Sequence, residues 1–200
     1  LEKLNLACTN IIYLTPLKDL IHLKFLDLCC TNISDLSTLE SLTNLETLDL
    51  YGCSYINDIS ALADLIALRD LDLDGLAITD VKALSNLSNL EFLDIMGTGV
   101  NNLTPLKSLI NLKELLIGET NVKDLSPLKN LINMETLILY YDDVSDLSPF
   151  RNMTKLKQLQ IQQTNITDVS SLKGLSLEDI VADDNLVQEL REMFPYADIR

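Results

Sequence analysis

Four cysteines and one histidine are the side chains of this sequence that could bind a soft metal ion or form a nucleophile with its base. The cysteines are Cys8, Cys29, Cys30 and Cys53, and the histidine is His22. Structural zinc sites usually draw on paired cysteines with a C-x-x-C type of spacing, and the sequence contains no such pair. The spacing therefore predicts free, buried or half-buried thiols and no metal site.

Catalytic machinery is not evident among the other polar residues. His22 has no obvious nucleophile as a partner, there is no glycine-rich phosphate loop, and the carboxylates recur at regular intervals. An active site needs such partners to converge. A row of carboxylates on a flat strand also does not supply the roughly six to eight converging oxygen ligands that Ca²⁺ takes. The sequence therefore predicts no enzyme, no catalytic residue and no cofactor.

The formal net charge is −15, from 30 acidic and 15 basic residues. Nucleic-acid binding requires a basic surface, so this balance argues against a nucleic-acid partner. No run of 18 apolar residues is present. That is about the minimum length for a membrane-spanning helix, so we expect no membrane insertion.

An internal repeat supplies the elements that position these residues. Residues 112–133 read LKELLIGETNVKDLSPLKNLIN, and this 22-residue pattern recurs almost end to end. A period of this length with L-x-x-L-x-L spacing indicates leucine-rich repeats. The other copies begin at Leu1, Leu23, Leu45, Leu68, Leu90, Met134 and Leu156, and a truncated one begins at Leu177.

Each repeat predicts one short strand and one short helix. The alternation in segments such as Leu48-Asp49-Leu50 is typical of a strand, and equivalent strands stack in parallel. A pair such as Ser126-Pro127 predicts an N-cap followed by the first helical residue, with room only for a 3₁₀ helix or one to two turns. The predicted fold class is α/β, a leucine-rich-repeat solenoid with a parallel β-sheet on the concave face and short 3₁₀/α turns on the convex face.

Several positions of the repeat predict local structural roles. A small polar residue after the strand, such as Thr31, is expected to pair with backbone groups of the turn. Cys8 and Cys30 lie at equivalent positions of neighbouring repeats, so a disulfide could join them instead of leaving free thiols. An extra residue within Tyr51–Tyr55 predicts a β-bulge where the third strand ends. One aspartate per repeat is expected to accept backbone N–H groups in an Asx-type turn. These aspartates are Asp35, Asp58, Asp80, Asp124, Asp146 and Asp168.

We expect residues 1–200 to form a single domain. Eight repeats occupy 1–176, and a truncated repeat with a C-terminal cap occupies 177–200. The cap is predicted to contain a helix that Asn185 caps and that runs to about Phe194, which shields the last repeat as solenoids require. Nothing equivalent is found at the N-terminus, so we expect that an N-terminal cap is missing from this sequence.

The strand residues between the framework leucines face the concave surface. The second position alternates in sign from Glu2 and Lys24 onward, which predicts ion pairs between neighbouring repeats. The fifth position places four aspartates side by side, and like charges in this arrangement repel. The row is therefore either an acidic stripe for a basic partner, together with Asp70 and Asp74, or a solvated row relieved by neighbouring Lys and Arg. The four aspartates are Asp27, Asp49, Asp72 and Asp94.

Large apolar and aromatic side chains share this face, mainly in repeats five to seven. An exposed patch of this kind favours contact with a partner, although the rings could instead pack only on one another. Gln160 belongs to a glutamine patch that could bind a peptide or glycan, or could be a solubilising edge. The predicted contact residues are Phe25, Asp27, Asp49, Tyr51, Asp72, Asp74, Phe92, Asp94, Met96, Leu116, Ile138, Tyr140, Tyr141 and Gln160.

With its 22-residue period, Ile at the eleventh position and L-S/T-P-L on the convex side, the sequence resembles the internalin-type bacterial leucine-rich repeats. The resemblance covers residues 1–185 and implies a curved right-handed solenoid that binds a protein on its concave face. We therefore expect a monomeric, non-catalytic protein-binding module whose partner carries a basic patch, from a bacterial surface or secreted protein. The intracellular phosphatase-regulator type of repeat (the SDS22-like class) shares the period and gives the alternative of a cytoplasmic scaffold, which four free cysteines favour. A third alternative is the targeting domain of a bacterial effector.

Overall fold

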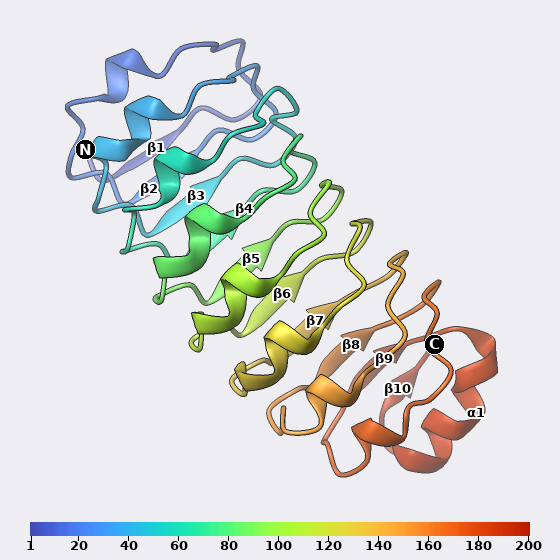
Figure 1. Ribbon diagram of the computed structural model, residues 1–200. Coiled ribbons are helices and arrows are strands. Elements are labelled where there is room, and N and C mark those ends of the chain that lie inside the picture. The colour runs from blue at the N-terminus through green and yellow to red at the C-terminus, as the bar shows by residue number, and fades with distance from the viewer.

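The computed structural model describes residues 1–200 as a curved stack of coils, with the two chain ends at opposite ends of the stack (Figure 1). All strands lie in one ten-stranded parallel sheet, and their order in the sheet is their order in the chain. This architecture confirms the predicted fold class. The strands are β1 (Lys3–Asn5), β2 (Phe25–Asp27), β3 (Thr47–Asp49), β4 (Asp70–Asp72), β5 (Phe92–Asp94), β6 (Glu114–Leu116), β7 (Thr136–Ile138), β8 (Gln158–Gln160), β9 (Asp179–Val181) and β10 (Asp198–Ile199).

Each repeat strand is three residues long, and from β2 to β9 its central side chain is buried. In β2, Leu26 is fully buried while Phe25 and Asp27 on either side are half-buried and face outward. The pairing register is continuous, with Leu26 opposite Leu48 and Leu48 opposite Leu71. Equivalent positions of the repeat therefore form rows of neighbouring side chains on the outward face of the sheet, which we call the concave face.

Short 3₁₀ helices line the other side of the stack, as predicted (Figure 1). Each contains three or five residues, because the chain must turn back into the next strand. They are η1 (Thr15–Leu17), η2 (Ser37–Ser41), η3 (Ser60–Leu62), η4 (Lys82–Asn86), η5 (Thr104–Ser108), η6 (Ser126–Asn130), η7 (Ser148–Phe150) and η8 (Ser170–Leu172).

Aspartate side chains, not Ser or Thr, receive the first free amides of these helices. Asp124 accepts a hydrogen bond from the backbone N–H of Ser126 at 2.8 Å, and all six predicted Asx-type aspartates make the equivalent bond. The prediction of Ser126 as N-cap with Pro127 as first helical residue is wrong. Ser126 is itself the first helical residue and Pro127 the second. The N–H of Leu128, which a Ser126 cap would accept, donates instead to the carbonyl of Leu125 at 3.0 Å.

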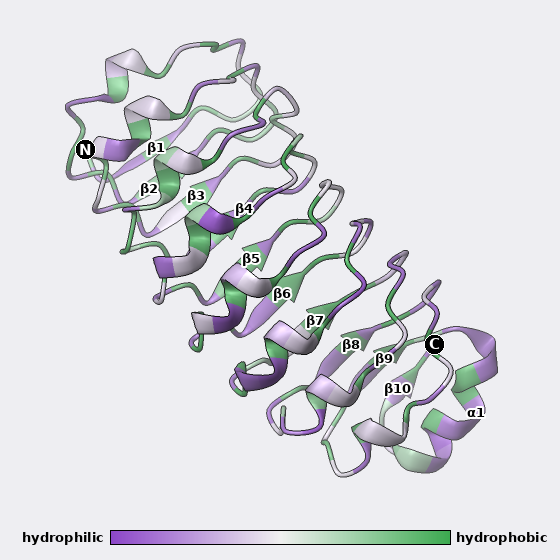
Figure 2. Cartoon of the chain, viewed as in Figure 1, coloured by the Kyte–Doolittle hydropathy of each residue, from purple (hydrophilic) through white to green (hydrophobic).

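The interior is one continuous apolar ridge. It contains 61 buried apolar residues in a single cluster, so no repeat has a core of its own. Apolar residues recur at the same places of each coil, in the strands and short helices, and hydrophilic residues gather in the turns (Figure 2). Stacking of neighbours thus provides the stability that an isolated repeat lacks.

In four repeats, the threonine that follows the strand bonds to the backbone of the turn in the predicted way. Thr31 donates its hydroxyl to the carbonyl of Leu28 at 2.8 Å, and Thr98 does the same to Ile95 at 2.6 Å. Repeat seven differs, since its Asp142 accepts both the N–H and the hydroxyl of Thr120, at 2.9 and 2.8 Å. The turn is thereby held across two repeats instead of within one.

The third repeat accommodates its extra residue without a β-bulge. Strand β3 pairs in register with β2 and β4 over its whole length. The insertion lies in the following turn, where the N–H of Ile56 donates to the carbonyl of Cys53 at 3.0 Å. The predicted bulge is wrong because this loop takes up the residue before the sheet ladder is affected.

The C-terminal segment contains helix α1 (Asp184–Met193), which begins two residues before the predicted start and ends one residue before Phe194. Asn185 lies inside the helix and is not its cap. The preceding residue is Asp183, whose carboxylate accepts the N–H of Gln163. Strand β10 follows the helix and pairs in parallel with β9. This tenth strand was not predicted, because it lies outside the repeat pattern.

Candidate functional site

The row of aspartates on the concave face has a local structural role that the sequence analysis missed. Asp27, Asp49, Asp72 and Asp94 lie in register on successive strands. Each accepts the backbone N–H of the residue two positions later, at 2.8–3.0 Å. Asn5 makes the same bond to Ala7 at 2.9 Å in the first repeat. The row therefore fixes the exit of each strand, in addition to any contact with a partner.

Burial changes the charge that this row presents. Asp94 is only 5% exposed, so the prediction that it lines the surface is wrong, and burial together with Asp72 raises its pKa to about 7. Burial also raises the pKa of Asp72 to about 6, and the pKa of Asp49 and Asp74 rises for the same reason. The stripe is therefore most negative above neutral pH.

The apolar and aromatic side chains of repeats five to seven form what we call the apolar band, which consists of Phe92, Met96, Leu116, Ile138, Tyr140 and Tyr141. The side chain of Tyr140 spans these three repeats. Its hydroxyl lies 3.5 Å from the sulfur of Met96, two repeats away. Its ring crosses the repeat between them over Gly118, where an added Cβ would lie 3.1 Å from the ring. Glycine at this position thus makes the span sterically feasible.

Two further features complete the band. Leu116 and Ile138 lie opposite each other on β6 and β7 and are half-buried. Tyr141 packs edge-on against Tyr140, with ring centroids 5.6 Å apart, and is 55% exposed. The rings therefore pack on one another and still leave apolar surface open on the concave face.

The structure places the other predicted contact residues on the same face. Tyr51 is exposed, and Phe25, Asp27, Asp49, Asp72, Asp74, Phe92, Met96 and Gln160 are half-buried. The list omitted the exposed acids Asp70, Glu114 and Glu119. The first two share the third repeat position with Phe25 and Phe92, which is the signal that could have found them. Burial, and to a smaller extent Glu119, raises the pKa of both Asp74 and Tyr140.

The alternating charges of the second position form ion pairs in only part of the row. Glu91 contacts both Arg69, at 2.6 Å, and Lys113. Lys24 pairs with Glu46 at 3.5 Å, and Lys157 with Glu178 at 3.0 Å. No pair joins Glu46 to Arg69. These contacts are exposed, and exposed pairs stabilise weakly, so the row assists solubility more than register.

All four cysteines are free thiols. Cys53 is buried and its sulfur contacts the carbonyl of Leu28 at 3.1 Å. The sulfurs of Cys8, Cys29 and Cys30 lie within 4.8 Å of one another, a convergence that their spacing in the sequence does not predict. Burial and Cys30 raise the pKa of Cys29 to about 12, so at neutral pH it is not a nucleophilic thiolate.

Comparisons with known proteins agree with this geometry. The family model described as leucine-rich repeats in two copies matches residues 21–64. Internalin C2 from Listeria monocytogenes is 34% identical and superposes with a TM-score of 0.88, over 90% of this chain and 80% of that one. The chain belongs to the internalin-type leucine-rich repeat proteins. This confirms the family that the repeat pattern indicated.

Two other solved structures share the architecture. The internalin InlF of Listeria monocytogenes is 25% identical, with a TM-score of 0.78 over 97% of this chain and 67% of that one. A leucine-rich repeat protein of Leptospira interrogans has 18% identity and a TM-score of 0.79, over 100% of this chain and 60% of that one, and shows the fold alone. No curated protein matches the sequence.

The family supports a general role as a protein-interaction module. Among the helices of this internalin-type chain, none combines the length and apolar content needed to cross a bilayer.

Proposed function

We propose that this internalin-type chain is a non-catalytic module that binds a protein partner on its concave face. One observation carries the proposal: an open sheet face holds a continuous band of apolar side chains over β5 to β7. Outward strand residues are expected to be polar unless something covers them, and exposed apolar patches mark interaction sites. Tyr and Met, both present in this band, are enriched at protein interfaces.

The proposed partner carries a basic patch beside an apolar or aromatic side chain. Asp70 and Asp74 lie on the same face as the band, and Glu119 lies beside it. Charges of one sign around an apolar centre accelerate encounter with a partner of opposite charge and fix its orientation. The proposed contact residues are those predicted from the sequence, with Asp94 supporting the strand exit from below instead of touching the partner.

Capture of a partner by the immobilised chain, at low and at high salt, tests the proposal. We expect Phe92→Ala/Tyr140→Ala to weaken binding by about 30-fold, as loss of central interface residues does. Asp70→Asn/Asp74→Asn is expected to weaken binding mainly at low salt, because screening already removes the steering at high salt. Affinities from titration of the captured partner give the measurement.

The matched control is Ile110→Ser/Ile132→Ser. These isoleucines are 54% and 53% exposed in the turns that precede β6 and β7, outside the concave face, and Ser88 occupies the equivalent turn of the fourth repeat. The control removes exposed apolar surface outside the concave face and is expected to keep full affinity. An equal loss of affinity in Phe92→Ala/Tyr140→Ala and in Ile110→Ser/Ile132→Ser, with folding intact, would mean that the apolar band is not the binding site.

We further propose a monomer with α1 and β10 as its C-terminal cap, belonging to a secreted or surface-exposed bacterial protein. The internalin-type repeats support this location. The free thiols of Cys8, Cys29, Cys30 and Cys53 favour the alternative, a cytoplasmic scaffold of the SDS22-like type, because reducing compartments keep thiols free. Recovery of the protein in the medium or on intact cells would distinguish the first location from the second.

A further inference from the structure

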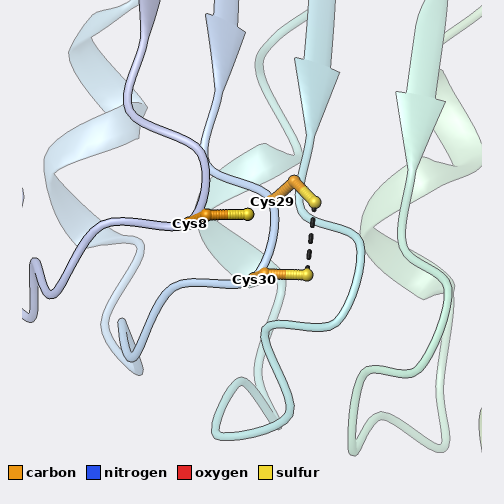
Figure 3. A group of neighbouring side chains, drawn as sticks. All are labelled: Cys8, Cys29 and Cys30. Carbon is orange, nitrogen blue, oxygen red and sulfur yellow. Dashed lines mark hydrogen bonds between the residues drawn. The ribbon is translucent and has the colours of Figure 1, made fainter.

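Three cysteine sulfurs meet at one edge of the concave face, in the first two repeats. Cys29 and Cys30 lie 3.4 Å apart at their sulfurs, and the sulfurs of Cys8, Cys29 and Cys30 are all within 4.8 Å of one another. They arise from two different coils, and all three side chains extend into the same small region (Figure 3). The apolar band used for the proposed partner lies three to five repeats away.

The repeat geometry explains why these sulfurs converge. Cys8 and Cys30 occupy the eighth position of adjacent repeats, and both have left-handed backbone with φ of 56° and 55°. The N–H of Cys8 donates to the carbonyl of Cys29 at 2.7 Å, which ties the two turns together. The next residue of this row is Gly52, and its missing side chain leaves space for the sulfur of Cys30, 3.3 Å from where a Cβ would lie.

The spacing of the sulfurs suits a tetrahedral ion. Zinc–sulfur bonds of about 2.3 Å place two tetrahedral ligands about 3.8 Å apart. The sulfurs of Cys29 and Cys30 are 3.4 Å apart, and no pair of the three is separated by more than 4.8 Å. Side-chain rotation alone can close the difference. Two carboxylates, from Asp27 and Asp49, lie within 4.8 Å of the Cys29 sulfur, so the surroundings favour a cation.

We propose that Cys8, Cys29 and Cys30 form a three-thiolate site for a thiophilic metal cation such as Zn²⁺, with a fourth coordination position open to water or to a ligand. Soft thiolate ligands select ions of this class over Mg²⁺ or Ca²⁺. Each bound thiol gives up its proton to solvent, and no electron is transferred. The proposal is independent of the concave-face partner, since it uses none of the apolar band.

Zinc binding to the full chain, kept reduced by a phosphine reductant that does not bind zinc strongly, tests the site. A chromophoric chelator competes for Zn²⁺ alone, and Co²⁺ reports thiolate ligands by its ultraviolet charge-transfer absorption. We expect one ion per chain and a rise in the thermal midpoint on adding Zn²⁺, because ligand binding stabilises the folded state.

Cys30→Gly is the decisive variant. Glycine occupies this position in repeats three to five, as Gly52, Gly75 and Gly97, all with positive φ, so the variant is expected to keep the fold. It should lower zinc affinity by roughly 100-fold or more, since losing even an outer partner of a metal ligand costs up to that much. Cys53→Ser, which alters the cysteine outside the cluster, should leave the affinity unchanged. Equal zinc affinity in wild type and Cys30→Gly, or no thiolate absorption with Co²⁺, would overturn the proposal.

Discussion

Asp94 is the residue whose chemistry departs most from its exposed counterparts. Its carboxylate accepts the N–H of Met96 at 2.8 Å in surroundings that leave it 5% exposed. Burial raises its pKa to about 7, against 3.8 for the free side chain. The folded state thus binds the proton more tightly than the unfolded state, and stability from this group falls as pH rises from about 4 to about 7.

We predict that Asp94→Asn stabilises the protein at pH 8 by roughly 2–3 kcal/mol. One unit of pKa shift corresponds to about 1.4 kcal/mol, so this gain is smaller than the whole shift of Asp94 would give. An asparagine can still accept the Met96 N–H, as Asn5 accepts that of Ala7. The gain should largely disappear at pH 4, near the ordinary pKa of 3.8, where Asp94 is protonated in the folded state and partly protonated in the unfolded chain. Urea unfolding of both proteins at the two pH values gives the measurement.

Asp124→Asn provides a control of opposite sign. Hydrogen bonds from Ser126 lower the pKa of Asp124, so its charged form is the one that the fold favours above about pH 4. Asn102 shows that an amide fits the equivalent turn, where it accepts the Thr104 N–H at 2.9 Å. This variant should be slightly less stable than wild type at pH 8. A gain in stability there would contradict the assignment of charge to the two rows.

The six convex aspartates could be predicted because each lies two residues before the amide it accepts, and the pattern repeats. The concave aspartates make the same bond. Their place on a strand indicated only that they face outward, so this bond was not predicted. The span of Tyr140 across Gly118 to Met96 could not be predicted. It depends on the rotamer of one ring over a gap left by a single glycine.

Among the elements, the short helix η7 contains the bulkiest core residue. Phe150 is fully buried at a position that is leucine in the other repeats, for example Leu128 and Leu172. The helix has only three residues, so packing and not propensity holds it in place. This repeat is therefore the most sensitive to loss of side-chain volume.

We predict that Phe150→Ala lowers the free energy of unfolding by about 3–5 kcal/mol, the usual cost of a large cavity. Phe150→Leu restores the residue of the neighbouring repeats and should cost about 1 kcal/mol. Chemical denaturation of the two variants beside wild type measures both values. Similar losses in both would indicate that the aromatic ring, and not the filled volume, is what the repeat requires.

Strand and helix positions followed from the 22-residue period, while two departures did not. The extra residue of repeat three lies in the turn closed by Cys53 and Ile56, because a loop deforms more easily than a paired strand. Strand β10 was missed since Asp198 and Ile199 carry no leucine pattern. Its pairing with β9 depends on α1 turning the chain back.

The acidic residues behind the net charge of −15 have different roles on the two faces of the molecule. The convex aspartates bond to their own turns, while Asp70, Asp74 and Glu119 stay on the concave side around the apolar band. The cysteine cluster lies near the N-terminal end of the same sheet. None of the three cysteines is a proposed partner contact, so binding of a partner on the band and of a cation at the cysteines can be measured separately.

Hydroxyl-radical footprinting of the complex would show whether a partner covers the concave face over β5 to β7. Tyr141 is 55% exposed beside the band, while Tyr13 and Tyr196, at 75% and 100%, lie elsewhere. Aromatic and sulfur side chains react readily, so each tyrosine and Met96 reports its own surface. We expect the partner to slow the oxidation of Tyr141 and Met96 and to leave the oxidation rates of Tyr13 and Tyr196 unchanged. Protection of Tyr13 or Tyr196 with Tyr141 still fully reactive would contradict it.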